Sequence, residues 1–228
     1  MSLEYDYIIA GGGSAGCVLA SRLANKSKDS ICLVEAGGSG KNLFIKMPAG
    51  NGFIFGNPKF DWGYHSVKQT QLNNRKIYFA RGKGLGGTSI VNGMVYIRGV
   101  AQDYDNWRQM GLDGWGYSDL LPYFKYSEGS TNRQNKFHGN QGPLKVEPAR
   151  NFSVLDEAFI KAAVETGHEF LDDFNANKRA GVSRIDSTTF RGVRQSSAIS
   201  YLKKVPKNLK IFTNTRVVKI IFNKNKAV

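Results

Sequence analysis

The chain has 228 residues, of which 41% are hydrophobic and 12% aromatic, values typical of a globular protein with a sizeable core. No apolar run is long enough to span a bilayer, and no signal peptide precedes the first expected strand. We therefore expect a cytoplasmic protein that is at most peripheral to the inner face of the membrane. The only two cysteines, Cys17 and Cys32, favour neither a disulfide framework nor a metal site, and we expect both to be buried.

The formal net charge of +14 needs an interpretation. A basic total of this size is compatible with nucleic-acid binding. However, the lysines are scattered along the chain, and no basic helix carries interleaved aromatic residues. We therefore expect no nucleic-acid partner and interpret the charge as a Lys- and Asn-rich surface that also attracts an anionic cofactor. Attachment to an anionic membrane surface stays an alternative.

The first predicted elements form one βαβ unit. Residues 5–10 are apolar and β-branched, as in a buried parallel strand, and residues 17–24 have apolar side chains at helical spacing. The sequence GGGSAG lies between them, and residues 30–34 form a second strand that ends at Glu35. A strand, a glycine-rich turn, a helix, a strand and an acid in this order predict a dinucleotide-binding unit.

Each glycine of this turn has a physical role in the predicted unit. Gly11 permits the tight turn, Gly13 lets a pyrophosphate come close, and Gly16 lets the helix pack on the strand. The helix N-terminus supplies free N–H groups for phosphate, and Glu35 is expected to accept hydrogen bonds from the adenosine ribose. The alternative is a tight turn in an α/β domain that binds no ligand.

A second glycine-rich segment, RGKGLGGTSIVNGMVYIRG, covers residues 81–99. Glycines let a backbone approach a ligand closely, so the segment alone predicts a ligand-binding loop of some kind. Together with GGGSAG it indicates a long dinucleotide. For Ser89 and Asn92 we favour contact with the cofactor, while capping of a turn or helix is the structural alternative.

The remaining elements follow from periodicity and turn residues. Residues 153–167 are the best amphipathic helix, with Val154, Leu155, Ala158, Phe159, Ala162 and Ala163 on one side. Ser118 is the expected N-cap of a helix over 118–126 that contains Pro122. We also expect strands at residues 76–79, 144–146, 209–212 and 217–222, a loop at 137–142, and helices at 104–107 and from Ser196 onward within 192–202.

His65, His138 and His168 are the only histidines. Each invites assignment as a catalytic base, but none has a sequence motif for base activation. We expect surface or structural roles for all three.

These residues carry a resemblance that covers essentially the whole chain. The sequence resembles the N-terminal part of a glucose–methanol–choline (GMC) flavin oxidoreductase, closest to the choline dehydrogenase and alkanol dehydrogenase branch. The matching motifs are DYII with GGGSAG, LVEAG from Leu33, FDW from Phe60, ARGKGLGGTSIVNGMVYIRG from Ala80, DYDNW from Asp103, HG with GPL after His138, and GVRQSSA from Gly192.

The resemblance implies an α/β fold, α+β overall. It is a Rossmann-like FAD-binding fold with the βαβ unit at the N-terminus and the beginning of a substrate-binding domain, and the C-terminal half of the family pattern is missing. The expected domains are residues 1–150, which bind FAD and include a flavin-covering segment; residues 151–207, which begin the substrate-binding or cap portion and include a connecting helix; and residues 208–228, whose strands return to the FAD-binding domain.

FAD is the cofactor that the resemblance implies, in place of a nicotinamide. Some relatives link the flavin covalently to a His just before the matching Asn; Val91 stands at that position here, so we expect noncovalent FAD. We also expect Val91, Asn92 and Met94 to face the flavin. The family pattern assigns cofactor contact to Gly11, Gly13, Ser14, Ala15, Gly16, Glu35, Ala36, Arg81, Gly86, Gly87, Ser89, Asn92, Gly93, Met94, Val95 and Val218.

The implied reaction is hydride transfer from an alcohol, choline-like or aliphatic, to flavin N5, giving an aldehyde or ketone. The family's catalytic His lies beyond the end of this chain, so we assign no catalytic residue and no metal here. A non-catalytic FAD- or nucleotide-binding module is one alternative, and half of a split enzyme completed by a second chain is another. The second glycine-rich segment disfavours a nicotinamide-dependent Rossmann enzyme.

Overall fold

A computed structural model describes residues 4–150, 153–176, 180–224 and 226–227. The chain forms two compact units. The first contains Met1–Gly93 and Arg194–Val228, and the second contains Met94–Val193. The domain boundaries expected near residues 150 and 207 stay predictions.

The first unit is organised around a parallel sheet in the order β1-β2-β11. Tyr7 pairs with Ile31, and Ile31 pairs with Leu209 on its other side. Helix α1 connects β1 to β2, which confirms the predicted βαβ unit. The elements are β1 (Tyr7–Ala10), α1 (Ser14–Lys26), β2 (Ile31–Val34) and β11 (Leu209–Phe212).

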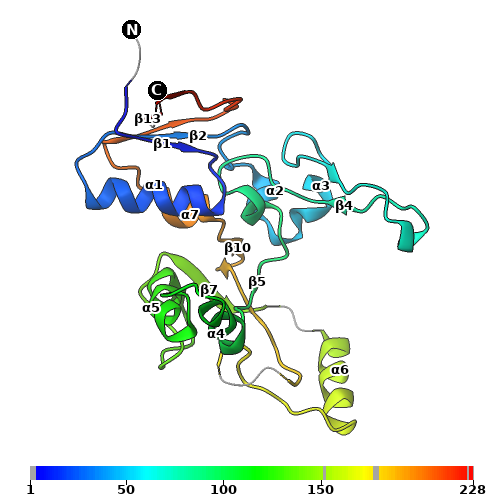
Figure 1. The fold of residues 1–228 in the computed structure, drawn as a ribbon. Coiled ribbons are helices and arrows are strands. Elements are labelled where there is room, and N and C mark those ends of the chain that lie inside the picture. The colour runs from blue at the N-terminus through cyan, green and yellow to red at the C-terminus, as the bar shows by residue number, and fades with distance from the viewer. Residues whose placement is uncertain (1–3, 151–152, 177–179, 225, 228) are drawn as a thin grey trace. The chain divides into compact units, whose positions relative to one another are not determined.

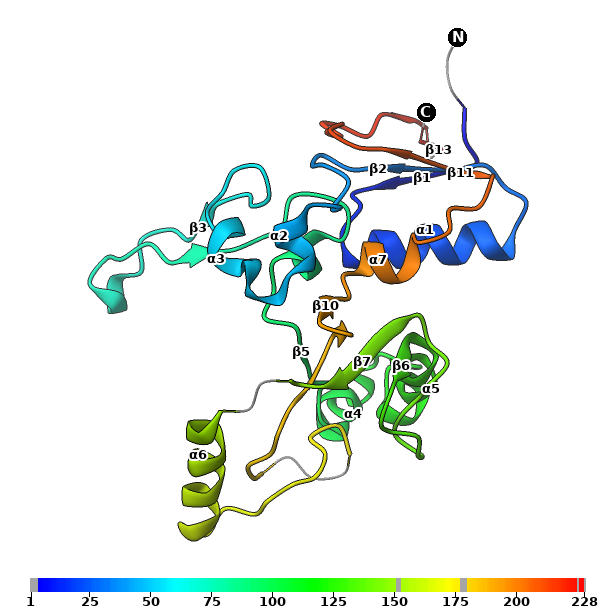
Figure 2. The ribbon, with the colours of Figure 1, turned by 180° about the vertical axis from the view of Figure 1, so that it is seen from behind.

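One face of this sheet carries the core. Helices α1 and α7 (Ser197–Tyr201) lie on the same side of it (Figure 1, Figure 2). Ile31 and Leu33 of β2 are completely buried, and burial of such a side chain contributes about 1.5–3 kcal/mol. The buried cluster consists of Ile9, Ala20, Ala24, Ile31, Leu33, Leu85 and Leu209.

Strand β1 is less buried than its sequence indicates. Ile9 is 9% exposed, but Ile8 is 64% exposed. Neighbouring side chains of a strand point to opposite faces, and only the face under Ile9 is covered by the described residues. The parallel pairing is confirmed, whereas the expectation of a fully buried strand is wrong for this structure.

Between the glycine-rich segments the first unit contains short elements around a second buried cluster. That cluster consists of Ile45, Ile54, Phe60, Ile90 and Val91. The strand expected at 76–79 is confirmed in shorter form as β4, which pairs antiparallel with β3. The elements are α2 (Leu43–Lys46), η1 (Pro48–Gly50), α3 (Asn51–Ile54), β3 (Tyr64–His65), η2 (Thr70–Leu72), β4 (Tyr78–Phe79) and η3 (Gly87–Ile90).

The second unit contains a four-stranded sheet in the order β5-β8-β7-β6. Pairs β5–β8 and β7–β8 are antiparallel, and β6–β7 is parallel. Strand β7 confirms the strand expected from Leu144, and the loop expected at 137–142 is confirmed as well. The strands are β5 (Val95–Tyr96), β6 (Glu128–Ser130), β7 (Leu144–Pro148), β8 (Asp186–Ser187) and β9 (Thr189–Phe190), and β9 pairs with β10 (Val193–Arg194).

Two of the predicted helices of this unit pack through aromatic residues. Helix α4 (Ala101–Gln109) and helix α5 (Tyr117–Ser127) confirm the expected pair, and the ring centroids of Tyr104 and Phe124 lie 5.4 Å apart. Ser118 is not the N-cap of α5. Gly116 takes that position, because its backbone N–H reaches the carboxylate of Asp119 at 3.1 Å. Pro122 is accommodated within the helix.

Helix α6 (Val154–Glu165) confirms the amphipathic prediction in its span and in its start. Ser153 is the N-cap and accepts a hydrogen bond from the backbone N–H of Asp156. The apolar side of α6, however, is not covered by the described residues: Val154 is 86%, Leu155 80% and Phe159 71% exposed. The helix itself is confirmed, and which of its faces is buried stays a prediction.

The last predicted strand is wrong. Residues 217–221 pair with no strand among the described residues, and β12 (Phe222–Asn223) instead forms a short antiparallel pair with β13 (Lys226–Ala227). A strand exists only where a neighbour takes up its backbone hydrogen bonds, and here the apolar run Val217–Phe222 has none before residue 222 in the described part of the chain. Val218 is consequently 87% exposed.

Both cysteines are free and buried, as expected. Burial raises the pKa of the Cys17 thiol to about 11, so this group is neutral at physiological pH. None of the described helices combines the length and the apolar character needed to cross a bilayer.

Candidate dinucleotide-binding site

The first glycine-rich turn joins β1 to α1 at the carboxyl end of the sheet. Gly11 has φ +104°, a conformation that favours glycine, and its N–H donates to the carbonyl of Val34 at 2.8 Å. A Cβ on Gly16 would lie 2.0 Å from the carbonyl oxygen of Gly11. Both observations agree with the predicted roles: Gly11 makes the turn, and Gly16 lets α1 pack against the strand.

The N-terminus of α1 is open to a ligand. Gly13 is the N-cap residue and provides no side-chain cap, and a Cβ built on it meets no atom within 4 Å. The first N–H groups of a helix lack partners within it and carry a partial positive charge. The turn therefore fits a pyrophosphate at Gly13, with Ser14 and Ala15 exposed next to it.

Glu35 lies directly after β2 and is only 6% exposed. Its Oε2 accepts from the N–H of Gly12 at 2.8 Å, and its Oε1 accepts from the N–H of Gly37 at 2.7 Å. The carboxylate is thus fixed between the glycine turn and the loop after β2. Each oxygen keeps a further lone pair, so the arrangement still permits the predicted bond to a ribose hydroxyl.

The second glycine-rich segment lies directly against the first. The N–H of Gly86 donates to the carbonyl of Gly12 at 2.8 Å. A Cβ on Gly87 would lie 2.6 Å from Cα of Gly13, so only glycine permits this approach. The hydroxyl of Ser14 also reaches the carbonyl of Gly86 at 3.4 Å. The two predicted ligand-binding segments therefore form one site.

Ser89 has the structural role that was its alternative interpretation. Its hydroxyl donates to the carbonyl of Gly86 at 2.6 Å and accepts from the N–H of Ser197, the first residue of α7, at 2.9 Å. Contact between Ser89 and a cofactor stays a prediction.

Asn92 is exposed, but its backbone carbonyl and its side-chain Oδ1 both accept hydrogen bonds from Nη1 of Arg194, at 2.6 and 2.9 Å. Sequence reasoning missed Arg194, although it lies within the motif GVRQSSA that supports the family resemblance. Burial lowers the pKa of Arg194 to about 10. At neutral pH it therefore remains a guanidinium cation inside the first unit.

Other residues of the predicted set have varied positions. Arg81 is exposed, and its N–H donates to Asp61 at 3.1 Å. Val91 is 1% exposed within a buried cluster, so the expectation that it faces a flavin is not met. Gly93 is exposed, as is Val218. Met94 (φ +62°) is buried and Val95 half-exposed, and both belong to the second unit.

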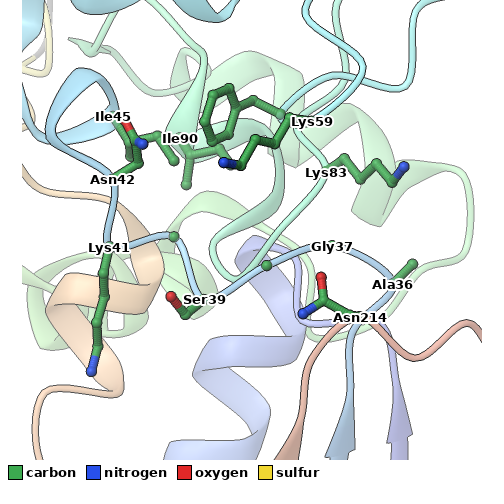
Figure 3. Close-up of a pocket in the computed structure, with 13 residues that line it drawn as sticks. Ala36, Gly37, Ser39, Lys41, Asn42, Ile45, Lys59, Lys83, Ile90 and Asn214 are labelled. Carbon is green, nitrogen blue, oxygen red and sulfur yellow. The ribbon is translucent and has the colours of Figure 1, made fainter.

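A cleft of about 560 Å³ lies beside the loop that follows Glu35 (Figure 3). Ala36 is the one predicted site residue in its lining, which also includes Lys59, Lys83 and Asn214. Figure 3 shows Lys59 and Lys83 across the glycine loop from Lys41, whose side chain extends away from them. The basic and polar lining suits an anionic or hydroxyl-rich ligand.

His138 has a structural role, through partners that the sequence did not indicate. Its Nδ1 lies 2.7 Å from Oε1 of Glu128, and its Nε2 lies 2.8 Å from Oδ2 of Asp173. Burial by itself lowers the pKa of His138, but the two carboxylates raise it to about 9. Arg98 pairs with the other Glu128 oxygen at 2.7 Å. His65 and His168 are exposed, in line with the surface roles expected for them.

The fold and the joined glycine segments define a dinucleotide-binding α/β protein, and comparison with known proteins gives its family. Residues 5–228 match the sequence profile of the GMC oxidoreductases, and the chain belongs to this family. The family resemblance seen in the sequence is thereby confirmed. GMC oxidoreductases bind FAD, so FAD is the cofactor of this family member.

Two curated relatives are oxygen-dependent choline dehydrogenases. That of Sinorhizobium fredii is 44% identical over 88% of this chain and 37% of the relative. That of Vibrio vulnificus is 38% identical over 100% of this chain and 41% of the relative. The chain thus spans less than half the length of these relatives.

Solved structures agree with this assignment. A pyridoxine 4-oxidase from Mesorbium loti superposes with a TM-score of 0.92 at 33% identity, covering 98% of this chain and 45% of the oxidase. An FAD-dependent oxidoreductase from Chaetomium thermophilum superposes with a TM-score of 0.90 at 30% identity, covering 99% and 41%. The mixed α/β FAD-binding fold expected from the sequence is confirmed.

Proposed function

We propose that this chain is the FAD-binding part of an oxidoreductase that oxidises a small alcohol, choline-like or aliphatic. The observation that carries the proposal is the hydrogen bond from Gly86 to Gly12, which joins the two glycine-rich segments into one site beside an uncapped helix N-terminus. The choline dehydrogenase relatives support the alcohol class. When bound, FAD supplies at its flavin N5 the acceptor for the hydride that leaves the alcohol carbon.

The residues of this chain bind and orient the cofactor. The N–H groups at the start of α1 neutralise pyrophosphate charge, while Gly13 leaves space for it to approach. Glu35 orients the adenosine ribose from the carboxyl end of β2. We propose that Gly86, Gly87 and Asn92 run along the ribityl and flavin portions. Val91 carries no imidazole for a covalent bond, which supports noncovalent FAD.

A non-catalytic FAD-binding module, or half of an enzyme completed by a second chain, is the other candidate. The fixed position of His138 between Glu128 and Asp173 favours it, because a histidine held by two carboxylates is not available as a general base for an alcohol. Among the described residues, His65 and His168 form no such ion pair with a carboxylate, and both are exposed. We therefore assign no catalytic residue to this chain.

The test is to purify the protein, load it with FAD and measure dye-linked oxidation of choline and of short aliphatic alcohols. We expect flavin absorbance with negligible turnover for the chain alone, and turnover when a chain carrying the remaining part of the family pattern is added. Robust turnover by the chain alone would contradict the absence of a catalytic residue. Absence of flavin binding would contradict the proposed function altogether.

We also propose a cytoplasmic location that is at most peripheral to the inner membrane face, where the net charge of +14 would supply the attraction. Binding to vesicles that contain phosphatidylserine, released by added salt, is the expected outcome. Equal binding to uncharged phosphatidylcholine vesicles would contradict it.

A further inference from the structure

Arg194 is a fully buried cation whose partners among the described residues are all neutral. Its side chain is 0% exposed. Its guanidinium donates to the backbone carbonyls of Ile45 and Asn92 and to the side-chain oxygens of Asn51 and Asn92. Within the described part of the chain, it forms no ion pair with a carboxylate. Arg98, the other arginine that is buried among the described residues, is paired with Glu128.

These bonds connect segments that are distant in the sequence. Nε donates to the carbonyl of Ile45 in α2 at 2.9 Å, and Nη2 donates to Oδ1 of Asn51, the first residue of α3, at 2.5 Å. Nη1 donates to both oxygens of Asn92 and, at 3.4 Å, to the carbonyl of Ser89. One planar fork therefore holds residues 89–92 against the segment 45–51.

A buried charge without an opposite charge is unfavourable for folding, because burial removes its hydration without a compensating ion. An apolar side chain of similar length would fill the same space without that cost. What an apolar side chain lacks is a rigid set of donors that reaches several acceptors at once. Asn92 supplies two of the acceptors for the Arg194 guanidinium. One is its backbone carbonyl and the other its side-chain Oδ1, so the hydrogen bonds fix both the backbone and the side chain of Asn92.

We propose that Arg194 is a positioning residue of the cofactor site: its guanidinium fixes the backbone and side chain of Asn92 so that this residue and Gly93 meet the flavin in one conformation. The proposal rests on the proposed function, which aligns Asn92 with the flavin. Arg194 itself acts through Asn92.

Arg194→Met and Arg194→Lys test this in the FAD-loaded protein. Methionine is expected to raise the dissociation constant of FAD about tenfold or more and to change the visible circular dichroism of the flavin, since several charge-assisted hydrogen bonds are lost. Lysine keeps the charge but lacks the planar fork, so FAD is expected to bind at least about threefold more weakly than in the wild type. Wild-type affinity and dichroism in Arg194→Lys would overturn the proposal.

Ile54→Ala is the control for a purely structural effect. Ile54 is completely buried in the same cluster as Ile45 and forms no side-chain hydrogen bond to Asn92. This variant should lower the unfolding midpoint and leave the flavin dichroism unchanged. If Arg194→Met changes the flavin signals no more than Ile54→Ala, the proposal is wrong.

Asn51→Ala provides a second variant if Arg194→Met does not fold. It removes the acceptor of Nη2 and a contact from Asn51 Nδ2 to the Asn92 carbonyl at 3.4 Å, and it leaves the buried arginine in place. We expect FAD to bind about two- to fivefold more weakly, with the same change of dichroism. Unchanged affinity and dichroism would contradict the positioning role. If the wild-type protein binds no FAD, the proposed function fails first.

Discussion

The backbone N–H of Gly86 donates a hydrogen bond to the carbonyl of Gly12 at 2.8 Å, across 74 positions of sequence. This bond places the second glycine-rich segment beside the first and leaves the N-terminus of α1 open. Close approach of the two backbones depends on the absence of side chains, because Gly87 and Gly13 touch where a Cβ would collide. The geometry of the proposed FAD site therefore follows from contact between two turns.

Gly87→Ala should disrupt this contact. A Cβ at this position would lie 2.6 Å from Cα of Gly13, and φ is +52°. We expect a loss of about 1–3 kcal/mol in the free energy of unfolding and weaker FAD retention. Chemical denaturation and flavin absorbance measure the two effects. Gly52→Ala is the matched control, since a Cβ there meets no atom within 4 Å; equal behaviour of both variants would contradict the contact.

Glu35→Gln should weaken FAD binding. The carboxylate accepts hydrogen bonds from the N–H groups of Gly12 and Gly37. In glutamine, the side-chain N–H₂ group would face one of these N–H groups, so that two donors would meet. The mismatch is expected to cost about 1–3 kcal/mol of stability as well, because Glu35 is buried. Fluorescence titration with FAD and thermal unfolding check both effects. Asp113→Asn is the control: it removes an exposed acid and should change neither the FAD affinity nor the thermal stability. Wild-type FAD affinity and stability in Glu35→Gln would contradict the assigned role.

His138 should make stability depend on pH in the alkaline range. Its pKa is raised to about 9 in the folded protein, above the ordinary value of 6.5. The stabilisation by Glu128 and Asp173 is therefore fully present below about pH 6.5 and is lost as the pH rises through 9, by at most about 3 kcal/mol. Urea unfolding between pH 6 and 10 measures it. His138→Gln should flatten this dependence, whereas exposed His65→Gln should leave it intact.

Noncovalent binding predicts complete release of the flavin on acid denaturation. Val91 carries no imidazole and lies buried among apolar residues, so no side chain at this position can bond covalently to the flavin. After trichloroacetic acid precipitation of the FAD-loaded protein, all yellow colour should remain in the supernatant. Flavin that stays with the protein pellet would show a covalent link.

The sequence predicted local elements well where one short segment contains the whole signal. Helix α1 begins within GGGSAG, at Ser14, and Ser153 and Ser196 cap α6 and α7, because capping and periodicity depend on neighbouring residues. The strand expected over 217–222 is wrong for the opposite reason. An apolar run becomes a strand only beside a partner, and the described residues supply none to Val218.

Partnerships between distant side chains escaped sequence reasoning. His138 was expected to be structural, but nothing nearby in the sequence indicates Asp173 as a partner 35 positions away. Arg194 is a similar case, since its acceptors lie 102 to 149 positions earlier. Ser89 was favoured as a cofactor contact, and the structure shows it bonded to Gly86 and Ser197.

By itself, the sequence determined the βαβ unit, the glycine-rich segments, the acid after β2 and the GMC family, because each of these depends only on residue type and on spacing along the chain. Only the tertiary structure decided that Gly86 meets Gly12, that Glu35 is fixed by two backbone N–H groups, and that a buried guanidinium fixes Asn92. Hydrogen bonds and close packing act between atoms in space. Their partners become definite only when the chain has folded.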